Sequence, residues 1–404
     1  VFVADLVSAE TISSLQAKGL NVLYNHSIQG DAFVQAAAEF NPQVLVVRSK
    51  KVTADVIAAA SSLELIVRAG AGVDNIDTAE ASRRGIFVAN CPGKNNIAVA
   101  ELVLGLVLAV DRKLGDAISS MKAGKWTKGD FANCRGLKGK TLGIIGFGFV
   151  GQEVAKRALS FGMAVHVFDV YLNHAVAHEL GVHVETEIDQ IYRVSDVITF
   201  HVPTTPETKG IINASLFEKT KPDVVIINTS RGDLANEAEL LQALDAHPEA
   251  WYAADVVSGE PAAKACDFSH PLAQHPRIYV TPHIGASTKQ AETAIGEEAL
   301  RVILKYASTR QLDAPNCVNL NKKKLGTHSL SVRYIPRPNI TIEVLGALAG
   351  ASVTIYDISN AVLLDAGSAT LSVSFKAENS DFLASVQDTV GGIAGVLQSV
   401  LIPS

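Results

Sequence analysis

Three residues able to do acid–base and anion-binding chemistry follow successive strand-like runs in the middle of the sequence. Arg231 lies in NTSRGD after VVII, Glu260 in DVVSGEP after WYAA, and His283 in TPHIGAST after RIYV. The carboxyl ends of parallel strands meet at one edge of a sheet, where open α/β sheets bind ligands. We therefore expect the three side chains to lie close together.

The chemistry of these residue types is complementary. An Arg can hold a carboxylate bidentately and polarise a nearby carbonyl oxygen. A His with a pKa near about 6.5 can exchange a proton with an alcohol, and an adjacent Glu orients it and raises that pKa. Taken singly, a structural His, a loop carboxylate and a turn-capping Arg are equally good explanations. Their coincidence with a nucleotide-binding pattern favours a catalytic site.

That pattern is GxGxxG, formed by Gly146, Gly148 and Gly151 between an apolar run and a helical segment. Its glycines allow a tight turn, backbone approach to a pyrophosphate and close helix–strand packing, and the helix N-terminus favours phosphates. Asp169 ends the next apolar run, where it can accept hydrogen bonds from ribose hydroxyls. No Arg immediately follows it, which favours NAD over NADP. The alternative explanation is a tight structural turn and a surface Asp.

Positioning these side chains requires a parallel α/β framework, and the first 300 or so residues alternate apolar runs with helical segments. The runs are nearly continuous in apolar residues, which is typical of strands buried on both faces. The alternation predicts doubly wound parallel sheets. The predicted strands cover residues 44–47, 65–67, 87–89, 142–145, 165–168, 197–200, 224–227 and 278–281.

Two long helical patterns divide this region into two Rossmann-like domains. Residues 96–110 form an apolar helix that can bridge two domains, and residues 289–306 can carry the chain back. We predict a discontinuous, flavodoxin-like substrate-binding domain and a contiguous NAD-binding domain, which cover residues 1–95 with 288–320, and 96–287.

A third unit follows a polar, basic linker at residues 319–327. Its elements, over residues 328–404, run strand, helix, strand, strand, helix, strand. This order predicts a small ferredoxin-like βαββαβ sandwich. About 75 residues suffice for one core, although a marginal one.

Composition excludes several classes of protein. The 404 residues include 35 Lys and Arg against 41 Asp and Glu, a formal net charge of −6, which argues against nucleic-acid binding. No run approaches the roughly 18–20 apolar residues of a membrane span. Four scattered cysteines argue against a zinc ribbon or a disulfide framework, so we expect a reducing, cytoplasmic compartment. The chain opens at Val1 inside a strand-like run, so we expect residues to precede it.

The motifs GFGFVG, NTSRGD, DVVSGEP and TPHIGAST closely resemble the D-isomer-specific 2-hydroxyacid dehydrogenase family over about residues 40–320. The resemblance implies an NAD-dependent oxidoreductase without a metal. His283 would be the acid/base, Glu260 its partner, and Arg231 the group that binds the substrate carboxylate and carbonyl. The implied cofactor contacts are Gly146, Gly148, Phe149, Val150, Gly151, Asp169, Val202, Pro203, Thr229, Ser230, Arg231, Asp255, His283, Gly285 and Ala286.

Three further passages resemble family members that act on a phosphorylated hydroxy acid. They are VVRSKKVT, whose Arg48 would meet a phosphate, RAGAGVDNID, whose turn offers backbone N–H groups to a carboxylate, and NCPGKNNIAVAEL. Lys50, Lys51 and Arg135 are further candidate cations. The implied substrate contacts are Arg48, Ser49, Ala71, Gly72, Val73, Asn95, Arg231 and His283.

The activity implied by this resemblance is oxidation of 3-phospho-D-glycerate to 3-phosphohydroxypyruvate, which begins phosphorylated L-serine biosynthesis. The alternatives within the family are a glyoxylate or hydroxypyruvate reductase and a D-lactate-type dehydrogenase. Arg48 and the C-terminal unit count against these smaller hydroxy acids. An NAD-sensing, corepressor-like binding protein is a further alternative, and the lack of a basic or disordered tail argues mildly against it.

The C-terminal unit resembles the ACT regulatory domain. Where serine-regulated relatives have His-x-Asn-x-Pro-Gly, this chain reads YIPRPNI, in which only Pro338 matches clearly. We therefore expect the unit to serve chiefly in oligomerisation, with an amino-acid effector as the minority alternative. The apolar helix at residues 97–110 is too hydrophobic to be left exposed, so we expect a homodimer core or a homotetramer.

Overall fold

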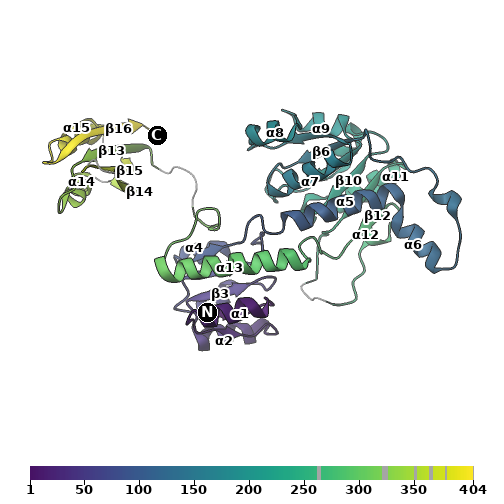
Figure 1. Cartoon of the computed structure of the whole chain (residues 1–404), viewed down its shortest axis with the longest axis horizontal. Coiled ribbons are helices and arrows are strands. Elements are labelled where there is room, and N and C mark those ends of the chain that lie inside the picture. Colours follow the sequence, from purple (N-terminus) through teal and green to yellow (C-terminus); the bar gives the residue numbers. More distant parts are fainter. Residues whose placement is uncertain (262–264, 321–325, 350–352, 364–366, 378–379, 404) are drawn as a thin grey trace. The chain divides into compact units, whose positions relative to one another are not determined.

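The structure is a computed structural model that describes residues 1–403 except 262–264, 321–325, 350–352, 364–366 and 378–379. The chain forms two compact units, Val1–Asn319 and Leu320–Ser404 (Figure 1). Residues 321–325 of the predicted linker lie outside the described residues. Among those described, no helix combines the length and the apolar character that crossing a membrane requires.

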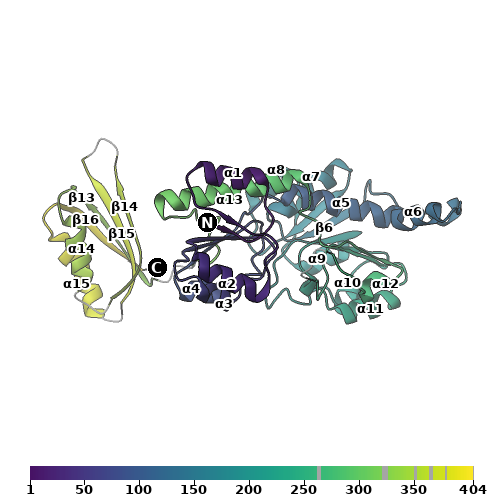
Figure 2. The ribbon, with the colours of Figure 1, turned by 90° about the horizontal axis from the view of Figure 1, so that it is seen from below.

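The first sheet of the larger unit is parallel, with five strands in the order β2-β1-β3-β4-β5. The strands are β1 (Phe2–Val3), β2 (Leu23–Tyr24), β3 (Val44–Val47), β4 (Leu65–Arg68) and β5 (Phe87–Ala89). Helices cover both faces, as continuous apolar strands require (Figure 2). One face carries α1 (Ala9–Ala17) and α13 (Lys289–Thr309); the other carries α2 (Gly30–Phe40), α3 (Ala54–Ala59) and α4 (Thr78–Arg83).

The second sheet is also parallel, with seven strands in the order β12-β11-β10-β9-β6-β7-β8. The strand order reverses beside β6, where open sheets bind ligands. The strands are β6 (Thr141–Ile145), β7 (Ala164–Phe168), β8 (His183–Val184), β9 (Val197–Phe200), β10 (Val225–Asn228), β11 (Trp251–Ala254) and β12 (Ile278–Val280).

Helices cover both faces of this sheet as well (Figure 2). On one face, Val103 and Val107 of the bridging helix pack with Val154 and Ala158 into one core. On the other face, Phe217 packs with strand side chains such as Phe200 and Ile226 into a second core. The helices of the two faces are α5 (Asn96–Arg112), α7 (Phe149–Ser160) and α8 (His174–Leu180), and α9 (Ile188–Val194), α10 (Ala214–Lys219), α11 (Glu237–Ala246) and α12 (Pro271–Gln274).

The apolar helix α5 is buried within its own unit. Val103, Leu104, Leu106 and Val107 are at most 5% exposed. Most of its apolar face is thus covered within its own unit, and the expected oligomer stays a prediction. Ile97 at the start of the helix is 49% exposed, and further exposed apolar side chains lie on the next helix, α6 (Leu114–Lys122), which has no buried residue and which we did not predict.

The smaller unit is a four-stranded antiparallel sheet in the order β14-β15-β13-β16, with two helices. Leu371, Val373 and Phe375 of the central strand β15 are fully buried against the helices. The element order is the predicted βαββαβ. The elements are β13 (His328–Tyr334), α14 (Ile340–Ala349), β14 (Val353–Val362), β15 (Ala369–Ala377), α15 (Ser380–Gly391) and β16 (Val396–Pro403).

The predicted fold class is confirmed: two parallel, doubly wound sheets and a separate small antiparallel one. Each predicted strand is present to within a residue or a few at its ends. The strands that we did not predict as such, β2 and β8, are two residues long and lie at sheet edges. The exact limits of two domains within Val1–Asn319 stay a prediction.

Candidate active site

The GxGxxG turn follows β6 and begins α7, as predicted, and its backbone fits a dinucleotide. A Cβ on Gly146 would lie 2.7 Å from the backbone of His201, and one on Gly151 would lie 2.2 Å from the carbonyl oxygen of Gly146. A Cβ on Gly148 would meet no atom within 4 Å. The first and third glycines are thus packed against protein, while the second faces open space suited to a pyrophosphate.

Polar groups suited to a nucleotide surround this turn. Gly148 begins α7 without a side-chain cap, so the first N–H groups of the helix are free for phosphate oxygens. Asp169 accepts hydrogen bonds from the N–H groups of Phe147 (2.6 Å) and Tyr171 (2.7 Å), and each carboxylate oxygen keeps lone-pair capacity for a hydroxyl donor. The Thr229 hydroxyl is buried without a partner, which marks it as a further candidate contact.

His283 and Glu260 form the predicted pair, with 2.6 Å between Nδ1 and Oε2. The hydrogen bond that His283 donates to the Glu260 carboxylate raises the pKa of His283, although burial acts in the opposite direction. Burial acts to raise the pKa of Glu260, but the hydrogen bond and charge of His283, the Val257 N–H group and the charge of Arg231 together hold it below its ordinary value. His283 has a φ of +52°, a strained backbone conformation that occurs preferentially at functional sites. The ring is about half exposed, so its other nitrogen can meet a substrate.

Asp255 supports the His283 loop from beneath. Its buried carboxylate accepts hydrogen bonds from the Thr281 hydroxyl (2.6 Å) and from the N–H groups of Ile284 (2.8 Å) and Gly285 (2.7 Å). These hydrogen bonds act to lower the pKa of Asp255, but burial outweighs them and raises it above its ordinary value. The geometry therefore assigns Asp255 a role in positioning the loop, while its predicted contact with the cofactor stays a prediction.

Arg231 follows β10 and meets a carboxylate from the other sheet. Its Nε and Nη2 atoms both lie 2.9 Å from Oδ2 of Asp74, in the turn after β4. Its Nη1 donates to the Ser230 carbonyl (2.8 Å), and Asn228 holds the Arg231 carbonyl (2.9 Å). The charge of Arg231 acts against the net rise in the pKa of His283, because the two groups lie within electrostatic reach of each other. The three predicted catalytic residues are therefore brought together.

Arg48 is positioned by a buried aspartate that the sequence did not reveal. Asp5 accepts hydrogen bonds from the N–H groups of Arg48 (3.0 Å), Ser49 (2.6 Å) and Lys50 (2.9 Å). Burial opposes, but these backbone bonds lower the pKa of Asp5. The Ser49 hydroxyl also donates to Asp5 (3.2 Å), and the predicted contact of Ser49 with the substrate stays a prediction. The Arg48 guanidinium reaches Glu292 on α13, with 3.0 Å between Nη1 and Oε1.

Arg68 is a further cation of this site, and we did not predict it. It ends β4, and its Nε is buried without a partner. Burial, together with the charges of Arg231 and Arg48, lowers the pKa of Arg68 to about 10. Three guanidinium groups thus gather near the carboxyl ends of the strands. The available signal was an Arg at the end of an otherwise apolar strand, LIVR.

The remaining candidate substrate contacts divide into two groups. Gly72 lies against Arg231, since a Cβ there would be 2.1 Å from Nη2, and Ala71 and Val73 flank it. Asn95 begins α5 and its side chain makes no capping bond. By contrast, the candidate cations Lys50 and Arg135 bind elsewhere in the chain, as shown by Lys50 Nζ to His26 O (2.9 Å) and Arg135 Nη1 to Asp223 Oδ2 (2.7 Å).

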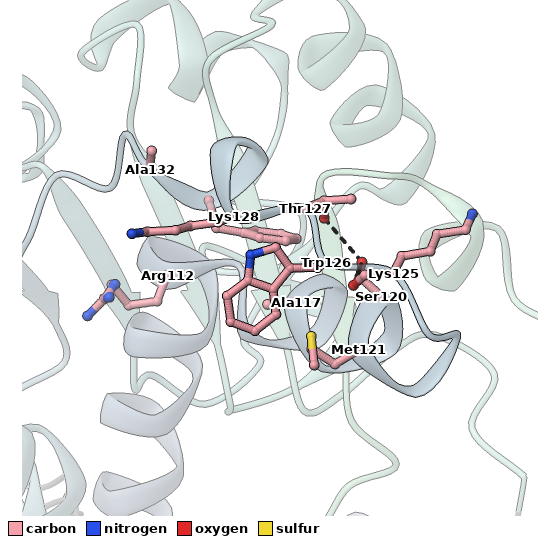
Figure 3. A pocket seen from close by; sticks show the side chains of 10 residues that line it. Arg112, Ala117, Ser120, Met121, Lys125, Trp126, Thr127, Lys128 and Ala132 are labelled. Carbon is pink, nitrogen blue, oxygen red and sulfur yellow. Dashed lines mark hydrogen bonds between the residues drawn. The ribbon is translucent and has the colours of Figure 1, made fainter.

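A cavity of about 550 Å³ lies away from these residues, beside α6 (Figure 3). Trp126 contributes a ring that is 80% exposed, and Ser120 Oγ lies 3.1 Å from Thr127 Oγ1 across the turn. A second hollow of about 340 Å³ is bordered by Lys51 and Asp74. Only the second is adjacent to the candidate site.

The sheet order with its glycine turn defines a dinucleotide-binding domain of the Rossmann type. Residues 104–285 match the family described as "D-isomer specific 2-hydroxyacid dehydrogenase, NAD binding domain". This stretch is therefore similar to the NAD-binding domain of the family that the motifs indicated.

Similar proteins include D-3-phosphoglycerate dehydrogenases. The protein of that name from Archaeoglobus fulgidus is 40% identical over 321 residues, 79% of this chain and 59% of its own length. The one from Bacillus subtilis is 39% identical over 277 residues, 68% of this chain and 51% of its own length. The chain thus spans only about half to three fifths of these relatives. The NAD+-bound 3-phosphoglycerate dehydrogenase of Entamoeba histolytica superposes with a TM-score of 0.63 at 27% identity, over 77% of this chain and 96% of that one.

Proposed function

We propose that this protein oxidises 3-phospho-D-glycerate to 3-phosphohydroxypyruvate with NAD. The observation that carries the proposal is the group formed by Arg48, Arg68 and Arg231 near the His283–Glu260 pair. One arginine suffices to hold a carboxylate, whereas a phosphorylated 2-hydroxy acid carries an additional dianionic group. The similar D-3-phosphoglycerate dehydrogenases add support to this substrate.

In the proposed mechanism, Arg231 binds the C1 carboxylate and the C2 oxygen, and Arg48 with Arg68 binds the phosphate. Neutral His283 removes the proton of the C2 hydroxyl through its exposed ring nitrogen. Glu260 holds the opposite nitrogen and stabilises the imidazolium that forms. The glycine turn and Asp169 would hold NAD, which would supply the hydride acceptor for C2 when bound.

Replacing Arg48 by alanine tests this assignment of the phosphate. We expect the KM for 3-phospho-D-glycerate to rise about 10- to 100-fold, because hydrogen bonds to charged groups are worth about 1.5–3 kcal/mol. The KM for unphosphorylated D-glycerate should change less than about twofold, since that acid has no group for Arg48 to bind. Steady-state NADH formation with both acids gives the two constants.

The matched control is Arg83→Ala, which removes an exposed arginine from α4, a helix that packs on the same sheet as the Arg48 loop. It should leave both KM values unchanged. An equal rise for both acids in Arg48→Ala would show that Arg48 does not recognise the phosphate.

The pH dependence of oxidation should report the raised pKa of His283. The base must be neutral, so kcat/KM falls as the pH drops through this pKa, which lies above about 6.5. Glu260→Gln removes the group that raises the pKa, so the acidic limb of the profile should move to lower pH. A limb that stays in place, or moves to higher pH, would mean that another group titrates.

Two other functions are compatible with parts of the site. A reductase of glyoxylate or hydroxypyruvate, or a D-lactate-type dehydrogenase, requires Arg231 and the His283–Glu260 pair. Its substrate has no phosphate for Arg48 and Arg68 to bind. A corepressor-like binding protein requires the nucleotide turn alone. The strained, glutamate-paired His283 favours a catalyst over this second class.

We further propose a homo-oligomer in the cytoplasm. Leu114, Ile118, Met121 and Trp126 of the α6 region are 43–80% exposed, which supports contact with a second copy there. The βαββαβ unit supports an ACT-like oligomerisation role, and its Arg337 is engaged by Glu343 and the Ala394 carbonyl in the loop considered for an effector. Sedimentation velocity of the whole chain measures the oligomeric state.

A further inference from the structure

Arg48 and Arg231, which we assign to the two ends of the substrate, each form an ion pair with a carboxylate of the chain. Glu292 lies 3.0 Å from Arg48 Nη1, and Asp74 lies 2.9 Å from two nitrogens of Arg231. Each pair joins segments far apart in sequence, by 244 and 157 residues. The carboxylates thus occupy the atoms that a phosphate and a substrate carboxylate need.

These two carboxylates differ from the structural carboxylates nearby. Their side chains are 49% exposed for Glu292 and 72% exposed for Asp74. Asp5, by contrast, is 2% exposed and is tied to four backbone N–H groups. Exposed ion pairs are weak and exchange their partners readily, whereas a buried hydrogen-bonded carboxylate does not. Glu292 and Asp74 are therefore placed to be displaced.

Electrostatics give these carboxylates a purpose when no substrate is bound. Arg48 and Arg231 both depress the pKa of the buried Arg68, so the three positive charges repel one another. Asp74 acts on Arg68 in the opposite sense. Negative charge beside the three arginines reduces this repulsion. When no substrate is bound, Glu292 and Asp74 supply that charge.

We propose that Glu292 and Asp74 are internal counter-anions that the phosphate and carboxylate of the substrate displace. This inference rests on the proposed function for the identity of the ligand. Glu292 competes with the substrate for Arg48, which binds the phosphate end. A dianionic phosphate displaces Glu292 from Arg48, whereas the neutral hydroxyl of an unphosphorylated acid does not. Glu292 is then a specificity-determining residue of the site.

The test is Glu292→Gln, which keeps the shape of the side chain and removes its charge. The KM for 3-phospho-D-glycerate should fall about two- to fivefold, the range given by exposed ion pairs, while that for D-glycerate should stay constant. Glu297→Gln, an exposed carboxylate on the same helix, controls for the general change in charge. A constant or raised KM for the phosphorylated acid, or an equal fall with both acids, would overturn the inference.

Asp74→Asn supplies the second arm. Both acids carry a carboxylate, so this variant should lower both KM values by a similar factor; a fall for one acid alone, or for neither, would contradict the role of Asp74. Inorganic phosphate provides a readout that does not depend on turnover. Titration calorimetry of the whole chain should show two- to fivefold tighter phosphate binding by Glu292→Gln. If that occurs while the wild type fails to oxidise 3-phospho-D-glycerate, the proposed function fails and the counter-anion role stands.

Discussion

Substitution of His283 by alanine should lower kcat for oxidation by about 10²- to 10⁴-fold, the usual contribution of a general base. The His283 ring is the proposed base, and its Nδ1 lies 2.6 Å from Oε2 of Glu260. The strained backbone of His283, with a φ of +52°, directs the ring to the site. Without the ring, the proton of the C2 hydroxyl must leave to water. The measurement is steady-state NADH formation with saturating 3-phospho-D-glycerate.

Binding of the cofactor separates this effect from misfolding. NADH affinity, measured by fluorescence, should fall far less than kcat, because the glycine turn and Asp169 follow other strands and are unchanged. His178→Ala, at an exposed position of α8, is the matched control and should keep full turnover. If His283→Ala retained most of its turnover with NADH bound normally, His283 would not be the base.

Replacement of Arg231 by alanine should lower kcat/KM by about 10²- to 10³-fold for phosphorylated and unphosphorylated acids alike. Two charge-assisted hydrogen bonds to the substrate carboxylate are lost, each worth about 1.5–3 kcal/mol before the discount for partial exposure. Arg231→Lys keeps the charge but loses the planar fork, so its kcat/KM should be intermediate. Kinetics on both acids check the prediction.

Stability must be measured beside these constants, because Arg231 also bonds Asp74 and the Ser230 carbonyl. The half-exposed pair contributes little, so Tm should change by only a few degrees. A kcat/KM within tenfold of the wild type in Arg231→Ala, with an unchanged Tm, would remove Arg231 from the carboxylate site.

The framework of the site could be predicted because its signals are local. Gly146 and Gly151 have close backbone neighbours that exclude any side chain, so the turn leaves a readable spacing. Arg231, Glu260 and His283 could be predicted to meet because each follows a strand, and parallel strands end at one edge. The helix α6 was missed although Leu114, Ile118 and Met121 recur at helical spacing, and these side chains are exposed instead of facing a core.

The ion pairs of the site could not be predicted, because they join distant segments. Nothing in the spacing connects Arg48 to Glu292, 244 residues away, or Asp74 to Arg231, 157 residues away. Asp5 reads as one more acidic residue at the end of a short strand, yet it holds the Arg48 loop. The same limit applies to the bonds that Ser49 makes to Asp5 through its N–H group and its hydroxyl.

With NAD as cofactor, the whole chain should prefer a phosphorylated 2-hydroxy acid to an unphosphorylated one. The whole chain is assayed with NAD on 3-phospho-D-glycerate, D-glycerate and D-lactate under the same conditions. The three arginines predict a kcat/KM for 3-phospho-D-glycerate that exceeds the other two by at least about 10-fold, the worth of one charged hydrogen bond. Equal values, or a preference for an unphosphorylated acid, would contradict it.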